Sequence, residues 1–270
     1  MAYDWIIDAL ATTWRQIDLA VAQRSERDFD ALTSCPGWSV RDVVNHVTGT
    51  ELFLRGAPIP DVTGAWPSYV VNSLGEMNEA FVASRRHLGR EEVLRDFRAA
   101  TASSVRHLRT LSPDQWRDEV WTPDGPRARS HAQETRVLDS WIHLHDIREA
   151  LLEPEDDHGI GEEIVVNRFE SALPYVWARR VGAPEGSLLR VNLVGHAGRS
   201  IQIEVQAGRG TAMPVSAREP DVEVTTAVGL FWRRMAGRIN AEAFLRASAT
   251  DIRGDRGWAQ RLAQGMTVVP

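Results

Sequence analysis

At 270 residues and 30.2 kDa, the chain is long enough for one large domain or for two smaller domains with separate cores. Its 43% hydrophobic and 25% charged residues are ordinary for a folded protein, and its single cysteine excludes an internal disulfide and any all-cysteine metal site. The net charge of −6 argues against nucleic acid or an anionic membrane surface as the main partner.

Residues 1–155 have the apolar periodicity of helices, and no strand is expected among them. Ser39 follows a Cys-Pro-Gly turn and is a plausible N-cap for the second helix. A turn is expected at 123–126. The five predicted helices cover about 4–25, 40–56, 69–87, 91–111 and 130–152. Such a series of helices predicts a helical bundle.

The pattern changes after the acidic segment 153–157, so we place a domain boundary between residues 155 and 156. Two alternating apolar runs, Leu188–Val194 and Ile201–Val205, are separated by glycines and predict a hairpin. Residues 156–270 are therefore expected to form a small α+β domain. Its other predicted elements are helices at about 161–181, 226–237 and 255–264, and short strands at 222–224 and 250–252.

Three ionisable residues share one face of the helix predicted at 130–152. Asp139, His143 and Asp146 lie at positions i, i+4 and i+7, so a common stripe carries them. An acid and a histidine four residues apart can bind one metal ion, although such a pair is also common on a solvated helix face. His46 lies at the margin of the apolar stripe of its own helix. With Asp139 and His143 it would complete a catalytic zinc site that keeps one coordination position open.

Segments 35–47 (CPGWSVRDVVNHV), 141–146 (WIHLHD), 235–238 (MAGR) and 254–256 (GDR) together resemble the mycothiol-dependent maleylpyruvate isomerase family. The resemblance covers nearly the whole chain. It implies a DinB-like helical bundle at 1–155, followed by a small C-terminal α+β domain at 156–270. All 31 basic residues are arginine, which agrees with an actinobacterial protein that uses the thiol mycothiol.

The resemblance implies that zinc is held by His46, Asp139 and His143. The family has Glu at the acid position, and Asp139 is one methylene shorter. Arg238 falls on an arginine thought to bind substrate or thiol, and we assign it a catalytic and cofactor-binding role; a cation at a helix C-terminus is the alternative. Trp66, on the loop after the second helix, would cover the pocket and contact the thiol, or would simply hold that loop in place.

The residues around the predicted zinc site leave several alternatives open. Asp42 and Asp146 could each orient a ligand imidazole or form an ion pair with arginine, and Asp146 could instead be a fourth ligand. His145 points away from His143 and is expected to pack or to contact a helix end. Cys35 has no histidine within its own segment, which argues against a nucleophilic cysteine.

The predicted function is that of a zinc-dependent mycothiol S-transferase, which activates the thiolate for attack on a small electrophile in detoxification or natural-product biosynthesis. A mycothiol-dependent maleylpyruvate isomerase is the first alternative. A non-catalytic small-ligand binding protein and a metal-dependent hydrolase are the others. Asp4 and Asp8 interrupt any signal-peptide core, so we expect a cytoplasmic protein without membrane or nucleic-acid partners, as a monomer or a homodimer.

Overall fold

The computed structural model describes residues 2–122, 125–154 and 158–269. These residues form two compact units, Met1–Gly161 and Glu162–Pro270, and each unit is described by itself. The predicted boundary at 155 and 156 and positions 123 and 124 of the predicted turn lie outside the described residues.

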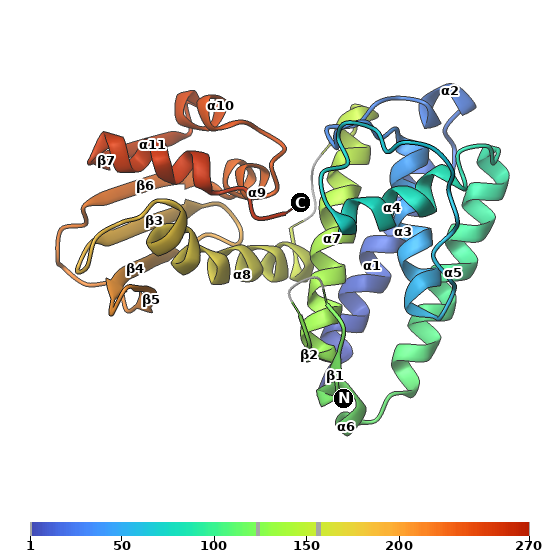
Figure 1. Cartoon of the computed structure of the whole chain (residues 1–270), viewed down its shortest axis with the longest axis horizontal. Helices are drawn as coiled ribbons and strands as arrows, with labels where there is room; N and C mark the ends of the chain where they lie inside the picture. The colour runs from blue at the N-terminus through green and yellow to red at the C-terminus, as the bar shows by residue number, and fades with distance from the viewer. Residues whose placement is uncertain (1, 123–124, 155–157, 270) are drawn as a thin grey trace. The chain divides into compact units, whose positions relative to one another are not determined.

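The N-terminal unit is a helical bundle (Figure 1). Helix α1 packs against α5 and α7, while α3 packs against α4, α5 and α7. The predicted bundle is confirmed, but the sequence did not predict the short helices α2 and α6. It also predicted no strand in this unit, whereas β1 and β2, of two residues each, form an antiparallel pair. The elements are α1 (Asp4–Val21), α2 (Glu26–Phe29), α3 (Val40–Leu54), α4 (Ser73–Ala83), α5 (Arg90–Thr110), α6 (Pro113–Arg117), β1 (Glu119–Val120), β2 (Arg127–Ala128) and α7 (Arg129–Ala150).

Apolar stripes hold the bundle together. Ile6, Leu10 and Ile17 repeat along one face of α1, and each has 0% of its surface exposed. Burial of one such side chain contributes roughly 1.5–3 kcal/mol before the entropy of folding is subtracted. Gly49 lets α4 approach α3 closely, because a Cβ there would lie 2.5 Å from the Cβ of Phe81.

Helix α3 begins where the sequence predicts. The hydroxyl of Ser39 accepts a hydrogen bond from the backbone N–H of Asp42, and the Asp42 carboxylate accepts one from the backbone N–H of Ser39. This reciprocal capping box satisfies two backbone donors at the start of the helix. It thereby fixes the start of the helix that carries His46.

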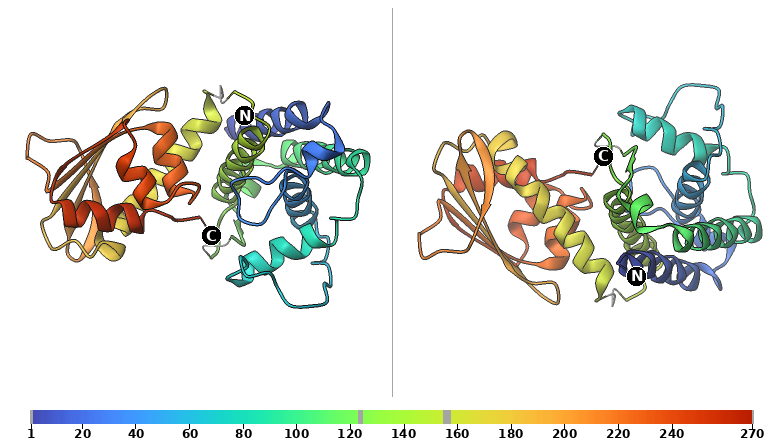
Figure 2. Two further views of the ribbon diagram at one scale, coloured as in Figure 1. Left: turned by 90° about the horizontal axis from the view of Figure 1, so that it is seen from above. Right: turned by 90° about the horizontal axis from the view of Figure 1, so that it is seen from below.

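The C-terminal unit is an α+β domain, as predicted. Its mixed sheet has the strand order β5-β4-β3-β6-β7, in which β3 and β6 are parallel and the other neighbours antiparallel. Helices lie against one face of this sheet (Figure 2). The elements are α8 (Ile160–Tyr175), the π-helix η1 (Val176–Arg180), β3 (Leu188–Val194), β4 (Ser200–Gln206), β5 (Arg209–Met213), β6 (Val222–Ala227), α9 (Val228–Met235), α10 (Ala241–Arg246), β7 (Thr250–Gly254) and α11 (Arg256–Gly265).

Alternation along the central strand β3 explains this arrangement. Leu189, Val191 and Leu193 are buried, whereas Arg190 and Asn192 point to the opposite, polar face. The hairpin of β3 and β4 is confirmed, with Val191 opposite Ile201. Strand β5 and helix α10 were not predicted from the sequence.

Candidate metal site

Helices α3 and α7 bring the three predicted zinc ligands together. His46 Nε2 lies 3.3 and 3.2 Å from the two carboxylate oxygens of Asp139, and His143 Nε2 lies 3.6 Å from Asp139 Oδ1. One ligand atom from each residue lies within 4.8 Å of the others. Both histidines are buried, while the Asp139 side chain is 34% exposed. The group is thus enclosed on the histidine side and accessible beside the carboxylate.

The distances from the Asp139 oxygens to the two histidine nitrogens fit a single zinc ion. With bonds of roughly 2.0–2.1 Å, two ligands of a tetrahedral zinc lie about 3.3–3.4 Å apart. The distances between the histidine nitrogens and the Asp139 oxygens, 3.2 to 3.6 Å, bracket that value. Two imidazoles and one carboxylate are also a donor set that zinc accepts. Asp139 therefore reaches both histidines although its side chain is shorter than glutamate.

Asp146 contacts the other nitrogen of His143. Asp146 Oδ2 lies 2.9 Å from His143 Nδ1, and Asp146 Oδ1 accepts a hydrogen bond of 2.9 Å from the hydroxyl of Ser34. A carboxylate in this position favours a proton on Nδ1 and leaves the Nε2 lone pair directed at Asp139. Of the three alternatives for Asp146, the contact with the far side of the imidazole supports the orienting role.

Among the described residues, no hydrogen bond or ion pair joins the Asp42 carboxylate to a histidine. Its carboxylate caps α3 and accepts a hydrogen bond of 3.0 Å from Nε of Arg86, so the ion-pair alternative holds for this residue. His145 is buried, and its ring packs on Trp141 with 4.0 Å between ring centroids. This packing agrees with the expectation that His145 is not directed at the other two imidazoles.

Two residues beside the histidines, Trp38 and Cys35, were not predicted to belong to this site. Trp38 is buried, and its indole lies against the rings of both His46 and His143. The half-buried Cys35 places its sulfur within 4.8 Å of ligand atoms of His143 and Asp146. The absence of a histidine from the segment of Cys35 was therefore a poor guide, because the fold supplies one from α7.

Trp66 and Arg238 occupy different units. Trp66 is 36% exposed on the segment between α3 and α4 and, within the described part of the chain, makes no ring contact or hydrogen bond through its indole. Arg238 follows α9, just after Gly237, whose φ is +73°. Its guanidinium donates a hydrogen bond of 3.0 Å to the carbonyl of Ala236, which matches the helix-terminus alternative.

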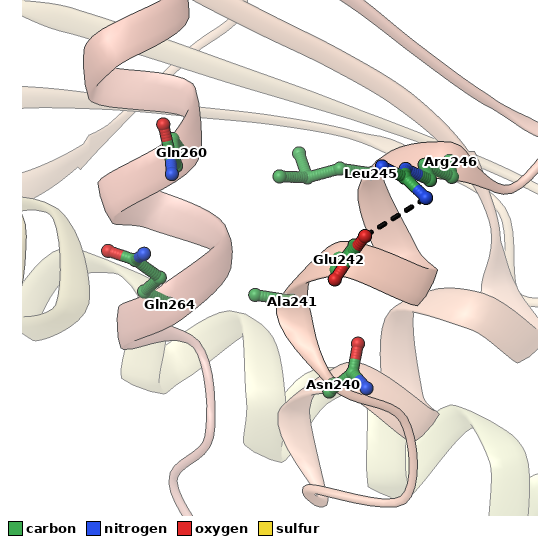
Figure 3. Close-up of a pocket in the computed structure, with 7 residues that line it drawn as sticks. All are labelled: Asn240, Ala241, Glu242, Leu245, Arg246, Gln260 and Gln264. Atoms are coloured by element: carbon green, nitrogen blue, oxygen red, sulfur yellow. Dashed lines mark ion pairs between the residues drawn. The ribbon is translucent and has the colours of Figure 1, made fainter.

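The C-terminal unit also has a groove of about 500 Å³ between α10 and α11 (Figure 3). Five of its seven lining residues have polar or charged side chains, and an ion pair of 2.9 Å between Glu242 and Arg246 lies along it. The lining residues are Asn240, Ala241, Glu242, Leu245, Arg246, Gln260 and Gln264. This lining lacks the histidines and convergent carboxylates of the site on α3 and α7.

Within the described ranges, no helix has both the length and the apolar character needed to cross a membrane.

No curated protein sequence is significantly similar to this chain. The chain resembles the crystal structure of a mycothiol-dependent maleylpyruvate isomerase with 16% identity and a TM-score of 0.60, over 93% of each chain. It also resembles a histidine-to-alanine mutant of such an isomerase, with 17% identity and a TM-score of 0.58, over 88% of this chain and 90% of that one.

At these identities the two likenesses establish the fold. Residues 10–148 match the family described as the mycothiol maleylpyruvate isomerase N-terminal domain. The matched region is more than half of the chain and contains the three residues whose donor atoms converge between α3 and α7. The chain therefore belongs to the mycothiol maleylpyruvate isomerase N-terminal domain family.

Proposed function

We propose that this protein is a zinc-dependent enzyme that uses mycothiol as a nucleophile, and that transfer of the thiol to a small electrophile is its reaction. The observation that carries the proposal is the convergence of His46, Asp139 and His143, in which both imidazoles lie 3.2 to 3.6 Å from the Asp139 carboxylate. Membership of a mycothiol-dependent family supports the choice of thiol. In this proposal the electrophile is a small molecule that is removed in detoxification or is an intermediate of natural-product biosynthesis.

In this proposal His46 Nε2, His143 Nε2 and the Asp139 carboxylate would hold the zinc, which would supply a Lewis acid that makes the thiol of mycothiol available as a thiolate near neutral pH. Asp146 keeps the proton of His143 on Nδ1, which leaves Nε2 as a donor. Three protein ligands leave room for a thiol as the fourth. The Asp139 side chain is partly exposed, and we expect the thiol to enter the site beside this carboxylate.

Two further residues complete the proposed machinery. Arg238 binds a carboxylate or polar head group of the electrophile or thiol through its planar guanidinium, which suits a forked contact with two oxygens. Trp66 contributes an exposed indole surface to thiol binding. The two contacts would orient the electrophile and the thiol for reaction, which would lower the entropic part of the activation free energy.

A second candidate reaction is isomerisation of maleylpyruvate. It is favoured by the likeness to isomerase structures over 88 to 93% of this chain. Addition of the thiolate to the carbon–carbon double bond, rotation about the resulting single bond and elimination of the thiol would return the thiol unchanged. Transfer consumes one thiol for each product formed, so the fate of the thiol separates the two reactions.

The test incubates zinc-loaded protein with mycothiol and either maleylpyruvate or a chromogenic aryl halide, and product and remaining thiol are quantified together. Thiol-dependent turnover that is lost with a chelator and restored by zinc supports the proposal. Consumption of thiol identifies transfer, and turnover without consumption identifies isomerisation. Hydrolysis without thiol would support a hydrolase, and ligand binding without turnover would support a binding protein; either result refutes the proposal.

A further inference from the structure

Trp38 lies in the turn before α3 and covers both histidines of the candidate metal site. Its ring centroid is 4.9 Å from that of His46 and 5.9 Å from that of His143, with interplanar angles of 39° and 34°. The two imidazoles are 4.9 Å apart. Trp38 is only 8% exposed, so its indole is a buried surface that packs beside these two rings.

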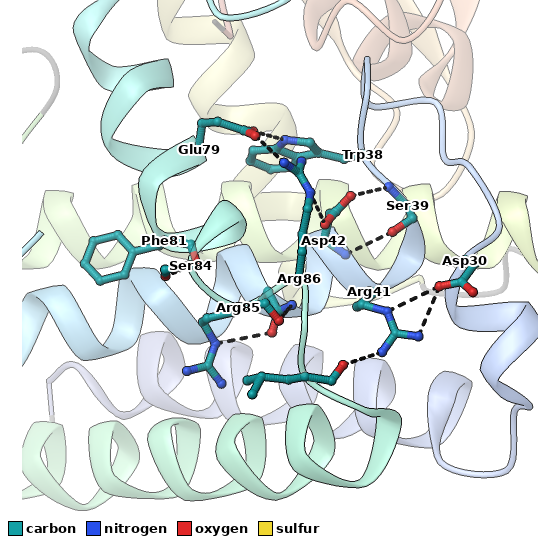
Figure 4. Close-up of polar contacts among 12 residues, drawn as sticks. Asp30, Trp38, Ser39, Arg41, Asp42, Glu79, Phe81, Ser84, Arg85 and Arg86 are labelled. Atoms are coloured by element: carbon teal, nitrogen blue, oxygen red, sulfur yellow. Dashed lines mark hydrogen bonds and ion pairs between the residues drawn. The ribbon is translucent and has the colours of Figure 1, made fainter. Parts of the chain in front are cut away.

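A buried carboxylate fixes the far edge of this indole. Trp38 Nε1 donates a hydrogen bond of 2.9 Å to Glu79 Oε2 on α4, and Glu79 is 1% exposed. Glu79 Oε1 accepts hydrogen bonds from Nη1 of Arg86, at 2.6 Å, and from the hydroxyl of Tyr69, at 3.2 Å. Figure 4 shows Trp38, Glu79 and Arg86 meeting beside Asp42.

The position of this network is determined by charge and by close packing. Burial of a carboxylate is costly unless it is paired, and Arg86 supplies the opposite charge to both Glu79 and Asp42. Burial alone would lower the pKa of Arg86, but its hydrogen bond to Glu79 and the charge of Asp42 raise it. Tyr69 packs on the turn itself, where a Cβ at Gly37 would lie 2.2 Å from its ring.

Hydrogen bonds restrain each imidazole at one ring nitrogen. Asp146 is the hydrogen-bond partner of His143 Nδ1, and Asp139 is the partner of His46 Nε2. His143 Nε2 lies 3.6 Å from Asp139 Oδ1, which is beyond hydrogen-bond distance. An imidazole rotates over a broad range about its Cβ–Cγ bond unless its neighbours restrict it. The fixed indole face of Trp38 blocks that rotation for His46.

We propose that Trp38 is a positioning residue, held by Glu79, which keeps the imidazoles of His46 and His143 directed at Asp139 before a metal binds. The inference rests on the proposed function, because it assumes that these nitrogens are metal ligands. Trp38 acts through the histidines and not on the substrate. Its effect is therefore expected in metal affinity and in the state of the metal-free imidazoles.

The test compares Trp38→Phe with Trp14→Phe in the full-length protein. Trp14 is a matched control: it is 3% exposed, and its indole donates a hydrogen bond of 3.0 Å to Ser140, but its ring contacts neither histidine of the site. Zinc affinity is measured by competition with a chromophoric chelator. Imidazole ¹⁵N resonances of the metal-free proteins report tautomer and ring order, and circular dichroism verifies folding.

We expect Trp38→Phe to weaken zinc binding about ten-fold or more, as loss of a group supporting a ligand usually does, and to alter the His46 resonances. Trp14→Phe should leave both near wild type. Glu79→Gln keeps an acceptor oxygen for the indole and should retain more zinc affinity than Glu79→Leu. Equal zinc affinity and unchanged imidazole resonances in Trp38→Phe would overturn the positioning role. Wild-type protein that binds no zinc would instead refute the proposed function and the inference with it.

Discussion

The buried ion pair between Arg136 and Glu51 joins the two helices that carry the candidate ligands. Arg136 lies on α7, three residues before Asp139, and Glu51 lies on α3 with His46. Arg136 Nε donates to Glu51 Oε1 at 3.0 Å, and Nη2 donates to the other carboxylate oxygen. The substitution Glu51→Gln removes the negative charge of this pair. The positively charged guanidinium of Arg136 then stays buried without an opposite charge from Glu51.

The expected cost follows from burial. The side chains of Arg136 and Glu51 are 10% and 2% exposed, so water cannot replace the lost partner. Removal of one member of a buried pair costs about 3–5 kcal/mol, whereas an exposed pair contributes about 0–1 kcal/mol. We therefore expect Glu51→Gln to lower the free energy of unfolding by about 3 kcal/mol or more. The double variant Glu51→Leu/Arg136→Met should lose much less than the sum of the losses of Glu51→Leu and Arg136→Met made singly.

The assay is urea unfolding of the full-length protein, followed by tryptophan fluorescence and completed as a double-mutant cycle. A large positive coupling between the two positions supports the reasoning. A loss below about 1 kcal/mol for Glu51→Gln, or additive losses in the double variant, would mean that water reaches this pair and that the argument from burial is wrong.

Three further changes test the site and its surroundings. Asp146→Asn should weaken zinc binding about 10- to 100-fold by competition titration, because the partner of His143 Nδ1 loses its charge; unchanged affinity would refute the orienting role. Burial, followed by repulsion from Arg55, lowers the pKa of His107 below its usual 6.5, so the unfolded chain binds the proton more tightly and this residue reduces stability as the pH falls below about 6.5. His107→Gln should therefore lose less melting temperature than wild type between pH 7.5 and 5, and equal losses would contradict the assignment. Arg238→Ala should keep wild-type zinc stoichiometry while thiol-dependent turnover falls, and unchanged turnover would leave Arg238 with the helix-terminus role.

The long helices could be predicted because each carries a repeating apolar stripe. Ile6, Leu10 and Ile17 on α1 all became core residues, and Ser39 marked the start of α3 through its side chain. The elements that were missed are short and depend on tertiary partners. Strand β5 contains Gly210 and has no alternating apolar pattern, and it pairs along β4. Its position depends on pairing with β4, which itself pairs with β3. The periodicity within the segment of β5 cannot reveal that pairing.

Part of the candidate site could be predicted for the same reason. Helical spacing places Asp139 and His143 on one stripe, and the inward margin of α3 indicated His46. Trp38 and Glu79 could not be recognised together, because they are 41 residues apart and meet only when the turn before α3 packs on α4. Their roles depend on contacts between elements and not on a pattern within either.

Metal content tests the central claim most directly. Wild-type protein, His46→Ala, His143→Ala and the control His145→Ala would be purified, incubated with zinc, desalted and analysed by mass spectrometry for bound metal. His145 is a suitable control because it is a buried histidine of the same helix whose ring packs on Trp141. We predict about one zinc per chain in wild type and His145→Ala, and a large loss in the other two variants. Wild-type protein without zinc, or full zinc in both His46→Ala and His143→Ala, would contradict the assignment of this site.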